Sequence, residues 1–246
     1  MKNINVIVFD HGNTLLMDPF LASLKVVKQK LPQLIENYGL KIKPDTLIKA
    51  WAKANKVVNY PNVSHFLQEE PIVSYALDSL KVPHLLIDLL SLDLLKEYRI
   101  ALKNIVKTNK RNKEVRNTLK ELIKRGKKLG VFSDDRRVDL LNNLSLMGIL
   151  EHFSYVFSSE EIGIEKPNKE VFKHIKNFFD IPEKQIVYIG DNPIRDIEAA
   201  KKFGFKAILY KAGNKYQEKW RNYHVKIAYK PDATIEKFSD ILKVIE

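Results

Sequence analysis

Five short, mostly apolar runs limit more than any other feature what this chain can fold into. They occupy residues 4–9, 129–132, 154–157, 186–189 and 206–210. Continuous apolar runs of this length are typical of strands covered by helices on both faces of a parallel sheet. From about residue 111 onward the runs alternate with helical patterns, an order that requires parallel strands joined by right-handed crossovers. The sequence therefore predicts a doubly wound α/β fold.

Two of the helical patterns have clear boundaries. Residues 193–203 begin with Pro193 and are followed by Gly204, the usual start and stop signals of a helix. Residues 111–125 place their apolar side chains at helical spacing. That predicted core face consists of Val115, Leu119, Leu122 and Ile123.

A stretch of about a hundred residues between the first two strands contains helical patterns and no comparable strand. The clearest pattern covers residues 44–59, and prolines punctuate the others. We therefore expect a helical insertion at residues 17–110 and an α/β core formed by residues 1–16 and 111–246.

Composition narrows the classes of function. The chain has no cysteine, which excludes disulfides, a catalytic thiol and a cysteine zinc site. The 42 Lys and Arg against 30 Asp and Glu give a net charge of +12, which suits anionic ligands. Nucleic acid is not favoured as a partner, because the basic stretch from Arg99 to Lys128 has no aromatic residues interleaved among its cations for base stacking. No membrane-spanning run or secretion signal is visible, and we expect a cytoplasmic protein.

Polar residues follow three of the apolar runs at the point where each run ends. Asp10, Ser133 and Asp191 hold these positions. Because the carboxyl ends of parallel strands share one edge of a sheet, these residues should converge on a ligand site there. Lys166, just before Pro167, and Asp196, five residues after Asp191, stand where they could reach the same edge.

In this order the motifs resemble those of the haloacid dehalogenase-like hydrolase superfamily, with a helical cap inserted after the first motif. The matching segments are FDHGNTLL with Asp10 and Thr14, LGVFSD with Ser133, GIEKPNKEVF with Lys166, and IGDNPIRD with Asp191 and Asp196. The resemblance implies hydrolysis of small phosphomonoesters through an aspartyl-phosphate on Asp10. It further implies that Ser133 and Lys166 hold the phosphoryl oxygens, and that Thr14 belongs to the catalytic loop.

The resemblance also implies a Mg²⁺ ion, held by Asp10, the backbone carbonyl of Gly12 and Asp191, with Asp196 in support. Electrostatics point the same way. Two carboxylates about 4 Å apart repel by roughly 4 kcal/mol at an effective dielectric constant of 20, before a phosphate dianion arrives. A hard cation with oxygen ligands relieves this repulsion.

The chain departs from the family pattern at Gly12, where most phosphatases of the superfamily have a second aspartate that protonates the leaving group and activates water. General acid–base catalysis typically contributes a factor of about 10² to 10⁴, so the enzyme should be slower unless His11 or a cap residue substitutes. Two other functions stay open, a noncatalytic phospholigand-binding protein and a metal-independent 2-haloacid dehalogenase. The Gly190–Asp191 pair, a metal-ligand arrangement, argues against the dehalogenase.

The sequence leaves the substrate and the oligomeric state open. In this superfamily the cap reads the substrate. Four cap residues with polar or aromatic side chains are candidates for that role: Tyr60, His65, Glu69 and Arg99.

Overall fold

The computed structural model describes residues 1–58, 69–212 and 228–246. The chain divides into two compact units. The first, here called the α/β unit, consists of residues 1–17 and 109–246, and the second, the helical unit, of residues 18–108. Each is described by itself.

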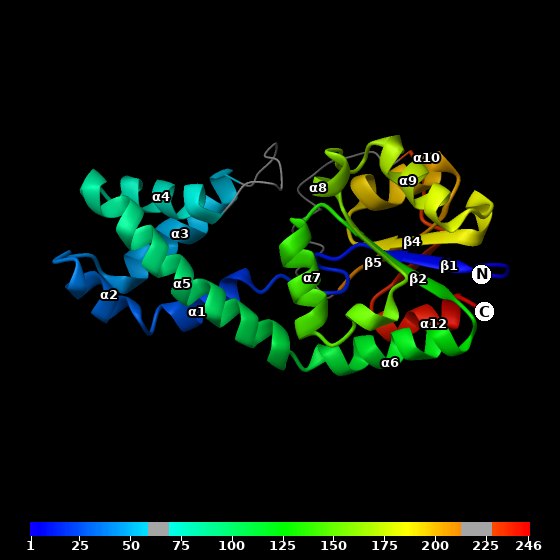
Figure 1. Ribbon diagram of the computed structural model, residues 1–246, viewed down its shortest axis with the longest axis horizontal. Helices are drawn as coiled ribbons and strands as arrows, with labels where there is room; N and C mark the ends of the chain where they lie inside the picture. The colour runs from blue at the N-terminus through cyan, green and yellow to red at the C-terminus, as the bar shows by residue number, and fades with distance from the viewer. Residues whose placement is uncertain (59–68, 213–227) are drawn as a thin grey trace. The chain divides into compact units, whose positions relative to one another are not determined.

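The α/β unit is built on a six-stranded sheet in the order β3-β2-β1-β4-β5-β6, in which every neighbouring pair is parallel (Figure 1). The strands are β1 (Val6–Phe9), β2 (Lys128–Ser133), β3 (Tyr155–Ser158), β4 (Ile186–Gly190), β5 (Lys206–Tyr210) and β6 (Ala233–Ile235). The chain leaves β1 in one direction for β2 and β3, and later returns to its other side for β4. This confirms the predicted doubly wound α/β fold and places the switch of strand order at β1 and β4, where such folds bind ligands. The short edge strand β6 was not predicted.

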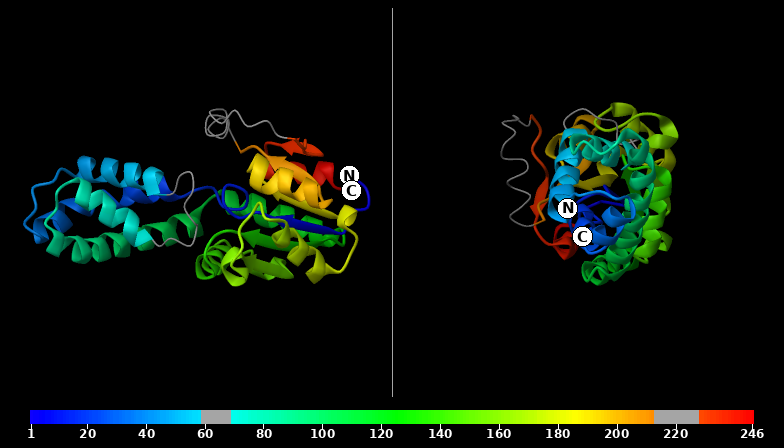
Figure 2. Two further views of the ribbon diagram at one scale, coloured as in Figure 1. Left: turned by 90° about the horizontal axis from the view of Figure 1, so that it is seen from above. Right: turned by 90° about the vertical axis from the view of Figure 1, so that its left-hand side faces the viewer.

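Helices cover both faces of the sheet (Figures 1 and 2). One face is covered by α9 (Lys169–Phe179) and α10 (Ala199–Phe203). The other face is covered by α6 (Arg111–Lys124) and α12 (Ile241–Val244). The helices α7 (Arg137–Leu146) and α8 (Ser159–Ile162) lie in the connections before and after β3. Side chains of β1 alternate between these faces. Val6 and Val8 belong to the core beneath α9, whereas the ring of Phe9 lies 5.7 Å from that of Phe238 on the opposite face.

The helix α6 ends one residue before its predicted boundary. Three of its four predicted core residues are buried, but the prediction for Ile123 was wrong, because its side chain is 43% exposed. Ile123 lies at the margin of the apolar stripe, where the helix has already turned away from the sheet.

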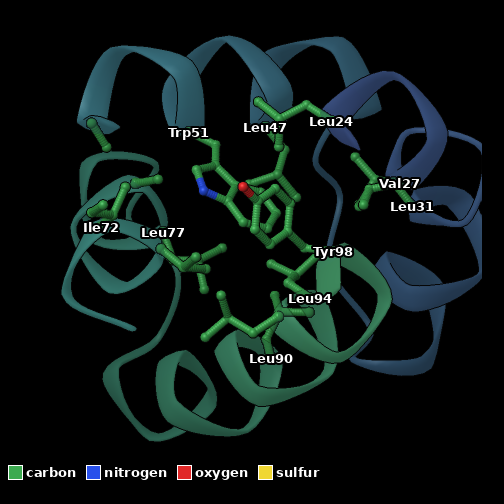
Figure 3. Packing of buried hydrophobic residues seen from close by; sticks show 14 of the residues in the cluster. Leu24, Val27, Leu31, Leu47, Trp51, Ile72, Leu77, Leu90, Leu94 and Tyr98 are labelled. Carbon is green, nitrogen blue, oxygen red and sulfur yellow. The ribbon is translucent and has the colours of Figure 1, made fainter. Parts of the chain in front are cut away.

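The helical unit contains α1 (Phe20–Val27), α2 (Leu31–Asn37), α3 (Pro44–Val58), α4 (Glu69–Ser79) and α5 (His84–Thr108). It has an apolar core of its own, drawn in Figure 3. At its centre the rings of Trp51 and Tyr98 lie 5.6 Å apart, joining α3 to α5. Leu47, Trp51 and Ala54 of the predicted helical pattern are buried in this core. Within the described part of the chain, no helix is both long and apolar enough to cross a membrane.

Candidate active site at the carboxyl edge of the sheet

Three buried aspartates gather at the carboxyl edge of the sheet. Asp10 follows β1 and Asp191 follows β4, and the register of these paired strands sets Phe9 beside Ile189, so the two aspartates leave neighbouring strand ends. Asp196 comes from the turn after β4. One carboxylate oxygen from each of the three lies within 4.8 Å of the others. The structure therefore brings together the three aspartates that the sequence analysis assigned to a metal site.

Lys166 is the cation of this cluster. Its Nζ donates to Oδ1 of Asp10 and to Oδ1 of Asp196, both at 2.7 Å, and its side chain is buried. Burial works against the charged amine, but the attraction of Asp10 and Asp196 raises the pKa of Lys166 well above its usual value. The amine is thus held as an ammonium between two carboxylates.

Asp10 experiences opposing influences. Burial raises its pKa, Lys166 lowers it, and the neighbouring charges of Asp196 and Asp135 raise it, with a pKa of about 7 as the result. One buried lysine is too little positive charge to keep the carboxyl of Asp10 fully ionised at neutral pH. The site is therefore short of positive charge before any substrate binds.

A π-helical turn, η3 (Pro193–Glu198), positions Asp196. The backbone N–H of Asp196 and that of Ile197 both donate to the carbonyl of Asn192, at 3.1 and 3.2 Å. The amide N–H of Asn192 donates in turn to Oδ2 of Asp196 at 2.9 Å. The structure has helix over the predicted residues 193–203, with π geometry in the first half and α geometry in α10. Such π-bulges are frequent at functional sites.

The loop after β1 carries Gly12 and Thr14. Oγ1 of Thr14, a buried side chain, donates to Oδ2 of Asp10 at 3.3 Å. Arg111, at the start of α6, donates through Nη1 to the carbonyl of Leu15 and through Nη2 to that of Thr14, at 2.5 and 2.7 Å. Residues of this loop are thereby tied to Asp10 and to α6. The carbonyl of Gly12 remains a predicted metal ligand.

The loop after β2 holds Ser133 and two further aspartates. Oγ of Ser133, a buried side chain, donates to Oδ2 of Asp135 at 2.8 Å, and the backbone N–H of Asp135 donates back to Oγ at 3.1 Å. Asp134 instead accepts from Arg195 at 2.6 Å and from the backbone N–H of Lys166 at 3.1 Å. Asp134 thus links the lysine's backbone to the β2 edge.

Asp134, Asp135, Arg195 and Arg111 were not predicted as site residues. Two consecutive acids directly after Ser133, at a strand end, were a usable signal for the aspartates. No sequence signal marked the arginines, since their partners are mostly carbonyls or side chains distant in sequence.

Among the candidate cap residues, Arg99 donates to Glu69 at 3.0 Å and to Glu70 at 2.8 Å, which joins α5 to α4. Arg99 and Glu69 thus pair with each other within the helical unit, and their role in reading the substrate stays a prediction. Tyr60 and His65 lie outside the described residues.

Comparisons with known proteins agree with this geometry. Residues 71–210, more than half of the chain, match the family described as haloacid dehalogenase-like hydrolase. The chain belongs to this family. The match begins after the first motif, so it does not include Asp10, whose assignment to the site stays a prediction from its own motif.

Curated relatives of this hydrolase-family chain match it in part. A protein of Methanocaldococcus jannaschii named glyceraldehyde 3-phosphate phosphatase is 36% identical over 101 residues, 41% of this chain and 44% of that protein. One of Pyrococcus abyssi with the same name is 31% identical over 131 residues, 53% of each chain. A Bacillus mycoides pyrophosphatase is 27% identical over 52% of this chain and 56% of its own. The chain thus matches about half the length of these relatives.

Solved structures resemble the fold over nearly its whole length. A HAD-hydrolase of Bacillus subtilis bound to magnesium has a TM-score of 0.67 at 16% identity and covers 99% of each chain. A 2-haloacid dehalogenase of Pseudomonas syringae has a TM-score of 0.62 at 19% identity, covering 98% of this chain and 97% of its own. At these identities the likeness concerns the fold alone.

Proposed function

We propose that the protein is a Mg²⁺-dependent hydrolase of small phosphomonoesters that works through an aspartyl-phosphate on Asp10. The observation that carries the proposal is the buried cluster of Asp10, Asp191 and Asp196, in which the ammonium of Lys166 bonds to Asp10 and Asp196. A further cation at this cluster would reduce the mutual repulsion of three buried carboxylates. The pKa of Asp10 is raised mainly by burial and further by the charges of Asp196 and Asp135, and bound positive charge would lower it again.

The donor set fits Mg²⁺. All side-chain oxygens of the cluster are carboxylate oxygens, which hard cations prefer, and no thiolate ligand exists in this cysteine-free chain. Asp10 and Asp191 would hold the ion together with the carbonyl of Gly12, while Asp196, already bonded to Lys166, supports the arrangement. The ion supplies positive charge that offsets the repulsion between the carboxylates and the phosphate oxygens.

The chain's own residues then divide the work. A carboxylate oxygen of Asp10 attacks phosphorus, the bond to the leaving oxygen breaks, and water later cleaves the aspartyl-phosphate. Lys166 and Ser133 bind phosphoryl oxygens, as an ammonium and a hydroxyl at the same sheet edge. Thr14 orients Asp10 through its hydrogen bond to Oδ2.

The relatives support a phosphorylated substrate. Their names, glyceraldehyde 3-phosphate phosphatase and pyrophosphatase, describe enzymes that act on small anionic phosphates. The net charge of +12 suits such ligands. We propose a small phosphorylated molecule as the substrate class and leave its identity to the assay.

A 2-haloacid dehalogenase is the alternative function, and a solved dehalogenase has a similar fold. The fold therefore does not decide between a phosphatase and a dehalogenase. The buried metal-type cluster favours the phosphatase, because a dehalogenase that needs no metal gains nothing from three carboxylates crowded around one lysine.

The test is a hydrolysis screen over sugar phosphates, nucleotides, phospho-acids and p-nitrophenyl phosphate, with Mg²⁺ and with chelator, beside a chloride-release assay on 2-chloropropionate. We expect Mg²⁺-dependent phosphate release that Asp10→Asn abolishes, since an amide is not a nucleophile. The matched control is Asp180→Asn: Asp180 is exposed, caps α9 in a left-handed conformation that asparagine also tolerates, and lies on the chain before the amino end of β4. Metal-independent chloride release, or phosphate release retained by Asp10→Asn, would refute the proposal.

A further inference from the structure

The backbone at Gly12 leaves room for a side chain that the sequence does not provide. A β-carbon built on Gly12 meets no atom within 4 Å, and Gly12 does not have the left-handed backbone that would favour glycine. Neither crowding nor strain explains why an acid is missing two residues after Asp10. The acid–base function of such an acid, about 10² to 10⁴ in rate, must come from elsewhere if the proposed phosphatase is efficient.

Asp135 is a carboxylate at the same edge of the sheet. In the ladder between β1 and β2, Phe9 pairs with Val131, and two residues further along each chain stand His11 and Ser133. The loop that follows Ser133 therefore emerges beside the loop that follows Asp10. Asp135 is close enough to Asp10 for its negative charge to contribute to the raised pKa of Asp10.

Asp135 is held by its neighbours and remains partly exposed. Its Oδ2 contacts Nδ1 of His11 at 2.5 Å and accepts from Oγ of Ser133 at 2.8 Å. Its backbone carbonyl accepts a hydrogen bond from Oγ of Ser158, and its side chain is nevertheless 38% exposed. Two bonds to one oxygen fix the direction of the carboxyl group while the group stays within reach of a ligand.

Its neighbours are less suited to exchange protons with a substrate. The side chain of Asp134 is only 8% exposed and is bonded to Arg195 and to the backbone of Lys166. His11 is buried, and its Nε2 has no hydrogen-bond partner among the described residues and no exposed surface. His11 can orient Asp135 through Nδ1, but it does not itself reach a bound ligand.

We propose that Asp135 supplies the general acid and base of the reaction in place of the residue missing at Gly12, with His11 as its positioning residue. The inference rests on the phosphatase mechanism proposed above. As the bond from Asp10 to phosphorus forms and the ester bond breaks, Asp135 gives its proton to the leaving oxygen, which departs as an alcohol. The Asp135 carboxylate then takes a proton from the water whose oxygen attacks phosphorus, the bond to Asp10 breaks, and Asp135 is again protonated.

The experiment compares phenyl phosphates that carry different ring substituents, because only poor leaving groups need a proton. We expect wild-type kcat/KM to depend weakly on the leaving group. In Asp135→Asn, which keeps an acceptor oxygen for Ser133, phenyl phosphate should lose about 10²-fold or more, and 4-nitrophenyl phosphate clearly less. The thermal midpoint and the calorimetric Mg²⁺ affinity should stay close to wild type, because the amide preserves the loop.

Rescue separates chemistry from structure. Gly12→Asp added to Asp135→Asn should restore much of the lost rate on phenyl phosphate, because the space beside Gly12 accepts a side chain. His11→Asn, whose amide nitrogen can replace Nδ1, should keep the wild-type leaving-group dependence, and His11→Leu should steepen it.

Two outcomes overturn the inference: an Asp135→Asn variant as active as wild type on every leaving group, or one that loses the same factor on all of them without rescue by Gly12→Asp. The phosphatase activity of Asp10→Asn tests the proposed function separately. If Asp10→Asn is inactive and Asp135→Asn behaves in either of these ways, only the assignment of Asp135 fails.

Discussion

Gly190 and the carboxylate of Asp196 are packed so closely that no side chain fits between them. A β-carbon on Gly190 would stand 2.3 Å from Oδ2 of Asp196. The glycine of the Gly-Asp motif therefore allows the strand end of β4 to approach an acid that arrives from the π-helical turn. A displacement of Asp196 would break the hydrogen bonds that Lys166 and the backbone N–H of Asn192 donate to its two carboxylate oxygens.

Replacing Gly190 by alanine should accordingly displace Asp196 and damage the metal site. We expect Gly190→Ala to weaken Mg²⁺ binding at least tenfold in calorimetry and to lower the thermal midpoint. Gly130→Ala is the matched control in the same sheet, where the new methyl would meet the rings of Tyr155 and Phe179 at 3.1 and 3.2 Å. It should reduce stability while Mg²⁺ affinity is maintained. Equal Mg²⁺ affinities in Gly190→Ala and wild type would contradict the prediction.

Removing the charge of Lys166 should destabilise the metal-free protein. Lys166→Met leaves Asp10 and Asp196 buried without their ammonium, and breaking a buried ion pair in this way costs about 3–5 kcal/mol. Urea unfolding at neutral pH measures the loss. Mg²⁺ should recover part of this loss, because it provides positive charge to the same carboxylates. A variant as stable as wild type in chelator would show that the lysine is not ionised there.

The raised pKa of Asp10 predicts opposite pH dependences for the metal-free and the metal-bound protein. A carboxyl whose pKa moves from 3.8 to about 7 on folding stabilises the fold fully below pH 3.8, and this contribution is lost as the pH rises through about 7. Mg²⁺ requires the ionised carboxylate, so its affinity should increase over the same interval. Calorimetry near pH 6 in buffers of different ionisation enthalpy should detect proton release on binding. Mg²⁺ binding without proton release near pH 6 would contradict a raised pKa.

Arg111 should act as a clamp on the loop that follows Asp10. Its guanidinium donates to the carbonyls of Thr14 and Leu15 and to the hydroxyl of Tyr210, and it stacks over the ring of Phe238 at 5.3 Å. Lysine cannot reproduce this planar fork, so we expect Arg111→Lys to lower both stability and kcat.

Arg116→Lys on the same helix is the matched control, because Arg116 makes a hydrogen bond to one carbonyl, that of Met147, which an ammonium can also make. Thermal unfolding and steady-state kinetics of both variants test the difference. Similar small losses in the two would show that the clamp is not needed.

The fold could be predicted from the sequence because strands that are buried on both faces of a sheet appear as short, continuous apolar runs. The edge strand β6 was missed for the same reason: of its three residues only Ile235 is buried, and the exposed Thr234 lends it no apolar signal. The helix predicted from residue 193 is present, but its π geometry was not predicted, since proline and spacing indicate a helix start and do not distinguish π from α geometry.

The sequence alone was enough to predict which residues belong to the candidate site, because a parallel sheet brings all its carboxyl ends to one edge. These residues are Asp10, Ser133, Lys166, Asp191 and Asp196. Only the tertiary structure decided how these residues share charge. Lys166 bridges Asp10 and Asp196, and His11 contacts the exposed carboxyl of Asp135 rather than the buried one of Asp134. Such pairings depend on distances of a few ångströms between groups that are 30 to 156 residues apart in the sequence, and on burial that strengthens each charge interaction. Neither is encoded in any local pattern.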